Sequence, residues 1–263
     1  MGRALRQIPA WTLLIVMLAF IYLPVVVLVL FSFQGSTLPV PPFDGPSLGW
    51  YRRAFENDRL IASLGNSLIV GIASSAVATL LGFLAAYSLF RFNPRASALV
   101  RALLIAPITV SNLIVGLGLL IVLNVAGFGR SLLTVGIGHV VINLPLCFAI
   151  IYSQFGDQLR NLDNAAHDLG AGDFATMTRV IAPVLAAPII AAFCVSFTLS
   201  WDEFIIALLL SRFDVTLPVM IFEMMRAGLT PEINAAGTIV FAISIGMAMI
   251  AAFTMVLRRS GRP

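Results

Sequence analysis

Long stretches without a charged residue alternate along this chain with short polar segments. Each stretch holds the ~20 apolar residues that a helix needs to cross the ~30 Å hydrocarbon core of a bilayer. The pattern predicts an all-α integral membrane protein with six transmembrane helices. They fall within the charge-free windows 10–43, 60–90, 102–129, 131–156, 180–201 and 233–257.

Composition supports this prediction and excludes several kinds of chemistry. Of the 263 residues, 60% are hydrophobic and 11% are charged. All sixteen basic residues are Arg, and the sequence contains no Lys. Because a P-loop nucleotide site and a pyridoxal Schiff base both need a Lys side chain, neither is present. We predict no catalytic residue, no cofactor and no enzymatic activity.

The first window is interpreted as a retained span and not as a cleaved signal peptide. Its apolar stretch from Trp11 to Phe31 is longer than the core of a signal peptide, and no small-residue cleavage site follows it. Six spans place both termini on one side, with ten Arg residues there against six opposite. Since basic residues in short loops favour the cytoplasm, both termini and the connection after the fourth window are predicted to be cytoplasmic.

Two outer connections contain segments that we expect to be helical. Residues 48–60 are amphipathic, as in a helix that lies on a membrane surface. Residues 211–232 hold a short apolar stretch bounded by Pro218 and Pro231. Either segment can also serve as a simple cap over the ends of the spans, and the sequence leaves both interpretations open.

The connection after the fourth window carries the signals of a short helix. Asp163 is suited to cap a helix over 164–169, because its carboxylate can accept from the free amides of the first turn. Gly170 follows where a left-handed residue ends a helix. Two turns are unstable alone in water, so this helix must pack on something. From the residues alone, it is either a polar loop or a docking element for a partner protein.

Two faces and a second helix complete the expected structure of this connection. One face offers Ala165, Ala166 and Leu169, and the other offers Asn164, His167 and Asp168. Asp173 is suited to cap a second helix, which runs towards Pro183 and Pro188. The two prolines lack backbone donors and are expected to kink the entry into the fifth span.

The spacing of these residues resembles a motif of a known family. Asn164-Ala165-Ala166, Gly170, Val180, Ala182 and Pro183 are similar to the E-A-A-x3-G-x9-I-x-L-P loop of permease subunits in binding-protein-dependent ABC importers. The match lies between the fourth and fifth windows, as it does in that family. Two positions depart from the motif. Asn164 replaces the Glu and loses its charge, and Ala182 replaces the Leu.

The resemblance extends along nearly the whole chain, towards permeases of the spermidine/putrescine type. It implies one permease domain over residues 1–263, with a type I ABC importer fold in the bacterial inner (plasma) membrane. It also implies a coupling loop over 160–183, whose ATPase-coupling residues are Asn164, Ala165, Ala166, Asp168, Leu169, Gly170 and Pro183. The implied partners are an ATPase subunit dimer, a second and distinct permease subunit, and a periplasmic or lipid-anchored solute-binding protein. Membrane lipid surrounds the chain, and nucleic acid has no part.

Two adjacent acids mark a candidate substrate pathway. Asp202 and Glu203 follow the fifth window, although the apolar run continues over 204–210. The pair is therefore expected to lie within a helix, where carboxylates usually face a cavity or a partner charge. With the ring of Trp201 beside them, they are suited to a cationic amine. Glu223 is a further candidate on the outer side.

The alternative for the acid pair is a place at the outer interface, bound to Arg212 or Arg226. His139 and His167 stand at no metal-ligand spacing, so no metal site is predicted and both are expected to be structural. Three polar side chains are expected to link helices, namely Asn66, Asn112 and Asn143. Small residues at 71, 74, 75 and 78 place the second span deep in the bundle.

Together these features predict a transmembrane permease subunit of an ABC importer. It would pass a polyamine or a related amine from a solute-binding protein to the cytoplasm, using ATP hydrolysed by a separate subunit. Amino-acid-like compounds and ferric ion are the alternative cargoes. The rival function is a stand-alone secondary transporter, but the two halves contain no matching pair of Gly/Pro-broken segments.

Overall fold

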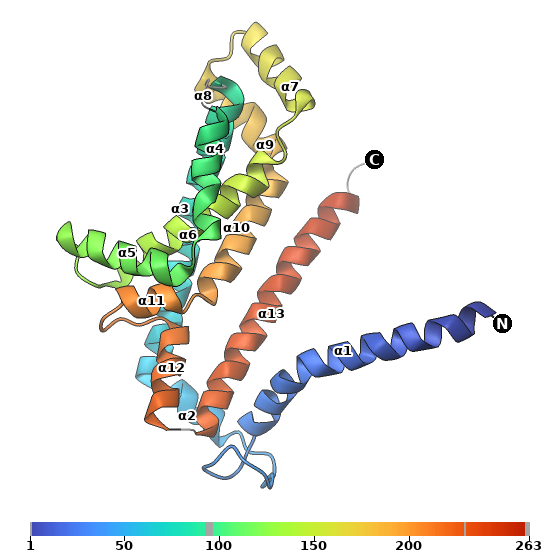
Figure 1. The fold of residues 1–263 in the computed structure, drawn as a ribbon, viewed down its shortest axis with the longest axis vertical. Coiled ribbons are helices and arrows are strands. Elements are labelled where there is room, and N and C mark those ends of the chain that lie inside the picture. Colours follow the sequence, from blue (N-terminus) through green and yellow to red (C-terminus); the bar gives the residue numbers. More distant parts are fainter. Residues whose placement is uncertain (1, 93–96, 229, 261–263) are drawn as a thin grey trace. The chain divides into compact units, whose positions relative to one another are not determined.

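The computed structural model describes residues 2–92, 97–228 and 230–260 (Figure 1). Within these ranges the regular structure is helical, with an isolated antiparallel bridge between Gln34 and Pro46. The prediction of an all-α protein is confirmed. In chain order the helices are α1 (Gly2–Ser32), α2 (Gly49–Glu56), α3 (Asp58–Phe92), α4 (Ser97–Ile105), η1 (Ala106–Thr109), α5 (Asn112–Val125), α6 (Leu132–Tyr152), α7 (Asp157–Asp168), α8 (Asp173–Thr176), η2 (Met177–Ile181), α9 (Ala182–Val184), α10 (Ala186–Trp201), α11 (Ile205–Leu210), α12 (Leu217–Ala227) and α13 (Pro231–Ser260).

All six predicted windows contain helix. Among the described residues, three helices are long and apolar enough to cross a membrane: the part of α1 from Trp11 to Ser32, α3, and α6. The third and fifth windows each hold helices joined at a sharp bend, and each bent pair meets the same requirement as one broken span. The sixth window lies in α13, whose first part, Pro231–Gly246, is a shorter apolar helix.

The third window is broken where α4 and η1 meet α5 at 105°. Pro107 lies in the first turn of η1, and Val110 after it is extended. The Ser111 hydroxyl then accepts a hydrogen bond from the amide of Leu113 at 3.3 Å. This N-cap starts α5 in a new direction, because it satisfies one of the free donors of the first turn.

The fifth window bends by 75° between α9 and α10, at Leu185. Pro183 and Pro188 flank the bend and cannot donate the backbone hydrogen bonds of a continuous helix. The kink predicted from these two prolines is confirmed. The π-helical turn η2 precedes α9, so the helical hydrogen-bond pattern of this connection is also irregular before the bend.

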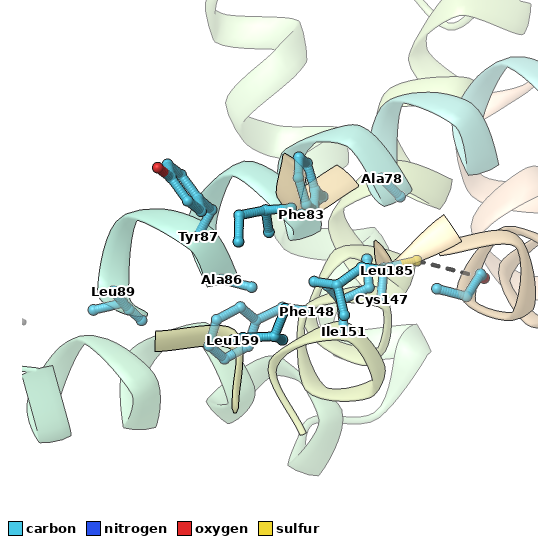
Figure 2. Close-up of a cluster of buried hydrophobic side chains, with 12 residues drawn as sticks. Ala78, Phe83, Ala86, Tyr87, Leu89, Cys147, Phe148, Ile151, Leu159 and Leu185 are labelled. Atoms are coloured by element: carbon cyan, nitrogen blue, oxygen red, sulfur yellow. Dashed lines mark hydrogen bonds between the residues drawn. The ribbon is translucent and has the colours of Figure 1, made fainter. Parts of the chain in front are cut away.

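By their contacts, the described residues form two compact units. Of the described residues, the larger unit contains 62–220 and 246–260, with most of α3 and all of α4 to α11. Its hydrophobic core is a cluster of side chains from α3, α6, α7, η2 and α10, with Leu185 at the bend (Figure 2). Gly82 of α3 lets the backbones approach closely, since a Cβ there would lie 2.8 Å from the amide nitrogen of Phe148. As predicted, Ser74, Ser75 and Ala78 of α3 are buried.

A buried hydrogen-bonded chain also links three helices of the larger unit. The Ser200 hydroxyl lies 2.6 Å from Nδ1 of His139 and 3.0 Å from the hydroxyl of Ser74. These residues come from α10, α6 and α3, and all three are buried. His139 therefore has the structural role that the sequence predicts. Asn66 is also a link, because its side-chain amide donates to the carbonyl of Val215 at 3.0 Å.

The smaller unit contains α1, α2 and residues 221–245. The loop between α1 and α2 folds around Gln34, whose side-chain amide donates to the carbonyl of Pro42 at 2.9 Å. The Trp50 indole donates to the carbonyl of Gln34 at 2.9 Å and anchors α2 to this loop. The predicted helices in the outer connections are present as α2 and α12. Their positions relative to a membrane surface stay a prediction.

Candidate functional site

The connection between α6 and α10 carries most of the predicted functional residues, and its first helix is longer than expected. α7 begins at Asp157, with Gly156 as its N-cap, so Asp163 lies inside the helix and caps nothing. The prediction that this helix starts at residue 164 is wrong. Residues 157–163 continue the helix because Leu159 packs into the hydrophobic core of the larger unit, where Figure 2 shows it near Phe148.

The end of α7 agrees with the prediction. Gly170 adopts φ +84°, the left-handed conformation. Its amide donates to the carbonyl of His167 at 2.8 Å, and the amide of Ala171 donates to the carbonyl of Ala166 at 3.0 Å. These two bonds form a Schellman motif, which satisfies carbonyls that a helix end leaves free.

Asp163 is a buried carboxylate that ties α7 to α3. The residue is 3% exposed. Its Oδ2 lies 3.3 Å from Nη1 of Arg91, and its Oδ1 accepts from the Tyr87 hydroxyl at 3.3 Å. A buried charge needs such partners, because leaving water costs several kcal/mol per ion. The sequence shows Asp163 only as a cap, since its partners lie far away along the chain.

Asp173 is the first residue of α8 and does not cap it with its side chain, so this prediction is also wrong. The carboxylate instead accepts from Nε of Arg91 at 3.1 Å and lies 3.0 Å from Nε2 of His167. Nδ1 of His167 lies 2.7 Å from the carbonyl oxygen of Asp163. The hydrogen bond to this carbonyl, followed by that to Asp173, raises the pKa of His167 above its ordinary value of 6.5.

The predicted faces of α7 are assigned differently in the structure. Ala166 is buried towards the spans, whereas Ala165 is exposed. Leu169 is 89% exposed, and Leu162 and Phe174 are exposed as well. The remaining predicted coupling residues, Asn164, Asp168, Gly170 and Pro183, are also exposed. An apolar surface of Leu162, Ala165, Leu169 and Phe174 therefore lies on α7, at its C-cap and on α8; we call it the coupling surface.

The acid pair lies at a break between two helices and not within one. α10 ends at Trp201, and α11 starts at Ile205. Asp202 is exposed and Glu203 is half-buried in the break. Glu203 Oε1 accepts from the amide of Ile206 at 3.0 Å, which supports the first turn of α11. Glu203 supplies this acceptor in place of the N-cap residue of α11, whose side chain forms no capping hydrogen bond.

Glu203 also meets the other broken window. Its Oε2 accepts from Nδ2 of Asn112 at 2.8 Å, and Asn112 is the first residue of α5, directly after the 105° bend. The prediction that Asn112 links helices is confirmed. No ion pair of Asp202 or Glu203 occurs among the described residues, so the alternative of pairing with Arg212 or Arg226 is not seen there.

The remaining pathway candidates have separate surroundings. Trp201 is 2% exposed, stacks on Phe197 at 6.1 Å between ring centroids, and its indole nitrogen has no hydrogen-bond partner among the described residues. Glu223 belongs to the smaller unit, where it forms an ion pair with Arg59 at 3.2 Å. Asn143 is buried in α6, and its amide nitrogen has no partner among the described residues.

Comparison with known proteins identifies the family. Residues 78–261 match the family described as "Binding-protein-dependent transport system inner membrane component". The chain belongs to this family. It is a multi-pass permease of binding-protein-dependent import, as the resemblance of its loop predicts, and the alternative of a stand-alone secondary transporter is set aside.

The permease has relatives and structural neighbours along nearly its whole length. It is 30% identical over 258 residues to the putrescine transport system permease protein PotI of Escherichia coli K12, which covers 94% of this chain and 91% of that protein. It is 29% identical over 232 residues to the spermidine/putrescine transport system permease protein PotC of the same organism, with 87% of each covered. A crystal structure of a bacterial alginate ABC transporter, in complex with an alginate-bound periplasmic protein, has a chain that matches with a TM-score of 0.73 at 15% identity, covering 95% and 94% of the two chains. This likeness confirms the predicted permease fold.

The residues of the permease that sequence reasoning missed are partners of residues that it found. Tyr87 and Arg91 hold Asp163. Arg91 ends a charge-free window, and an Arg in that place looks like an ordinary topology signal. The position of Asp163 in the sequence does not indicate which residues it binds. Its contacts with Arg91 and Tyr87 become visible only in the fold.

Proposed function

We propose that this permease imports a polyamine or a related small amine, as one of two permease subunits of an ABC importer. The observation that carries the proposal is its likeness over nearly the whole chain to two permeases that are named for putrescine or spermidine transport. A solute-binding protein delivers the amine on the outer side, and both termini of the permease lie in the cytoplasm.

The energy comes from a separate ATPase dimer. The coupling surface exposes Leu162, Leu169 and Phe174, although burying a large apolar side chain is favourable by ~1.5–3 kcal/mol. Such a surface on a short helix is suited to a cleft in a partner protein. Asn164 lies exposed beside it and offers hydrogen bonds where the motif of the family carries a charge. The chain itself has no Lys for a P-loop.

The amine passes the break between α10 and α11. Asp202 is exposed there and forms no ion pair among the described residues, so its carboxylate is available to an ammonium group. Glu203 holds the break in shape through Asn112 and Ile206. The Trp201 ring beside them is buried against Phe197, so it packs the end of α10 and the exposed carboxylate carries the attraction for the amine. Glu223 is a separate candidate within the smaller unit, where it forms an ion pair with Arg59.

Two measurements test this proposal. The permease is purified with a tag after expression with the neighbouring genes, and an ATPase, a second permease and a solute-binding protein are expected in the complex. If no ATPase is recovered, the coupling role is wrong. The ligand of the solute-binding protein is then measured with putrescine, spermidine, amino-acid-like compounds and ferric ion, and preference for a compound other than an amine overturns the assigned cargo.

The role of the acid pair is tested by uptake of labelled putrescine into cells. Asp202→Asn with Glu203→Gln is expected to lower uptake at least about tenfold, the effect of losing a charged contact of ~1.4 kcal/mol or more. The assembled complex is expected at normal yield. Asp214→Asn is the matched control, because it removes one exposed carboxylate from the connection before α12. Unchanged uptake in the double variant excludes the pathway through the break.

A further inference from the structure

Four charged or titratable side chains join three helices beside the coupling surface. They are Arg91 at the end of α3, Asp163 and His167 of α7, and Asp173 of α8; we call this group the clasp. Arg91 is its centre, because Nη1 lies 3.3 Å from Asp163 and Nε lies 3.1 Å from Asp173. One guanidinium thus bridges two helices of the connection, which its planar fork of donors allows.

His167 closes the clasp on the other side. Its Nδ1 lies 2.7 Å from the carbonyl oxygen of Asp163, and its Nε2 lies 3.0 Å from Oδ1 of Asp173. A carbonyl oxygen and a carboxylate are both acceptors, so each ring nitrogen must donate. Neutral imidazole carries a single N–H, whereas the imidazolium carries two. The geometry is therefore satisfied by the protonated ring, and the raised pKa of His167 agrees with this.

Among the charges that surround His167, the two carboxylates favour the protonated ring and the Arg91 guanidinium opposes it. α3 contributes Arg91 and the hydroxyl of Tyr87, which lies 3.3 Å from Oδ1 of Asp163. α7 contributes Asp163, and α8 contributes Asp173. Two carboxylates face one guanidinium, so the group carries a net negative charge unless His167 is protonated. Loss of the proton removes a hydrogen bond and the charge balance together.

We propose that the clasp is the positioning device through which α7 moves α3, and that a proton on His167 sets how tightly α7 and α8 are joined around Arg91 of α3. Import by the complex then depends on cytoplasmic pH. The inference rests on the proposed function, because it takes the coupling surface as the contact with the ATPase. The proposed function concerns the contact between α7 and the ATPase, whereas this inference concerns the link between α7 and the spans.

The sign of the pH dependence follows from the raised pKa. The contribution of His167 is fully present below its ordinary value of 6.5 and is lost as the pH rises through the raised folded value. Movement of α7 is then passed to α3 less completely. The ATPase continues to hydrolyse ATP, but fewer substrate molecules are imported for each ATP consumed.

The experiment uses the complete complex in liposomes with the α7 side outside. ATP and buffers from about pH 5.5 to about pH 8.5 are added there, across the range in which a His titrates. Labelled putrescine and the solute-binding protein are enclosed in the liposomes, and putrescine released to the α7 side per ATP hydrolysed is measured for the wild type, His167→Gln and His167→Arg. The ratio for the wild type is expected to fall about two- to fivefold as the pH rises, the effect of partly exposed charged hydrogen bonds. His167→Gln is expected to be low and His167→Arg high, each without this pH step.

Controls separate the clasp from stability and from the proposed function. Asp157→Asn removes an acid from the same helix outside the clasp and is expected to keep the wild-type step, whereas Asp173→Asn is expected to lose it. A pH step in His167→Gln equal to that of the wild type overturns the inference. If His167→Gln does not assemble, Asp173→Asn gives the same decision. Failure of the ATPase to join the wild-type complex defeats the proposed function instead.

Discussion

Nδ2 of Asn112 donates to Oε2 of Glu203 at 2.8 Å, and this bond joins the two places where helices break near the end of α10. Asn112 is the first residue of α5 after the 105° bend, and Glu203 lies in the gap before α11. Breaks in spanning helices leave backbone groups without partners, and side chains must satisfy them in a membrane. The bond therefore holds the two breaks together and places polar side chains between otherwise apolar helices.

We expect Asn112→Asp to disrupt this site, because it replaces a donor with a second carboxylate beside Glu203. The loss is estimated at about 1–3 kcal/mol, the cost of an unsatisfied charged hydrogen bond. Thermal unfolding of the purified permease at neutral pH is the measurement. Asn112→Asp combined with Glu203→Gln reverses donor and acceptor and is expected to recover most of the loss. If the double variant is no more stable than Asn112→Asp, the pair does not fix the break.

The end of α7 provides a second prediction. Gly170 has φ +84° with open space around it, so a side chain there meets backbone strain alone. Gly170→Ala is expected to destabilise the Schellman turn by about 1–2 kcal/mol. Hydrogen exchange of the amides of 157–171 should become faster. Gly172→Ala is the matched control, since Gly172 has φ −76° and open space as well. Equal exchange in both variants would show that the left-handed turn is not required.

The pattern of apolar windows predicts the helices well because the requirement is local. A helix that crosses hydrocarbon needs ~20 residues without unpaired charge, and this can be read from any segment alone. The bend at Leu185 is predictable for the same reason, since Pro183 and Pro188 cannot donate hydrogen bonds wherever they lie. The sharper bend before Asn112 was not predicted, because a single Pro107 and a Ser cap are weaker signals.

The errors concern residues whose role depends on distant partners. Asp163 is of a residue type that is common at N-caps, but its contacts with Arg91 and Tyr87 make it a buried anchor inside α7. The faces of α7 were also misassigned, because Ala166 and Leu169 lie on different sides once Leu159 fixes which side meets the core. A short helix has several possible orientations on a bundle, and its sequence alone does not choose between them.

Close packing of α3 on α6 gives a third prediction. A Cβ on Gly82 would lie 2.8 Å from the amide nitrogen of Phe148 and 3.0 Å from Cβ of Cys147, so the helices must separate. Gly82→Ala is expected to cost about 1–3 kcal/mol through overpacking. The midpoint of thermal unfolding in detergent measures the loss. Gly136→Ala, on α6 in open space, is expected to be neutral or slightly stabilising. An unchanged midpoint for Gly82→Ala would contradict this contact.

The coupling surface gives the last prediction. Leu169 and Phe174 are 89% and 75% exposed and contribute nothing to the core of the isolated chain. Leu169→Ser with Phe174→Ser should therefore leave the unfolding midpoint unchanged. In the complex each side chain is expected to be buried, with a gain of ~1.5–3 kcal/mol, so the affinity for the ATPase should fall at least about tenfold.

Titration of the ATPase against the permease in detergent measures this affinity. Phe213→Ser is the control, because Phe213 is 80% exposed in the connection before α12 and lies outside the coupling surface. It is expected to leave the affinity unchanged. Should the Phe213 variant weaken binding as much as the double variant, the loss reflects general hydrophobic adhesion. Should neither variant weaken it, the ATPase is bound through another part of the connection, and the apolar side chains of α7 and α8 need a different explanation.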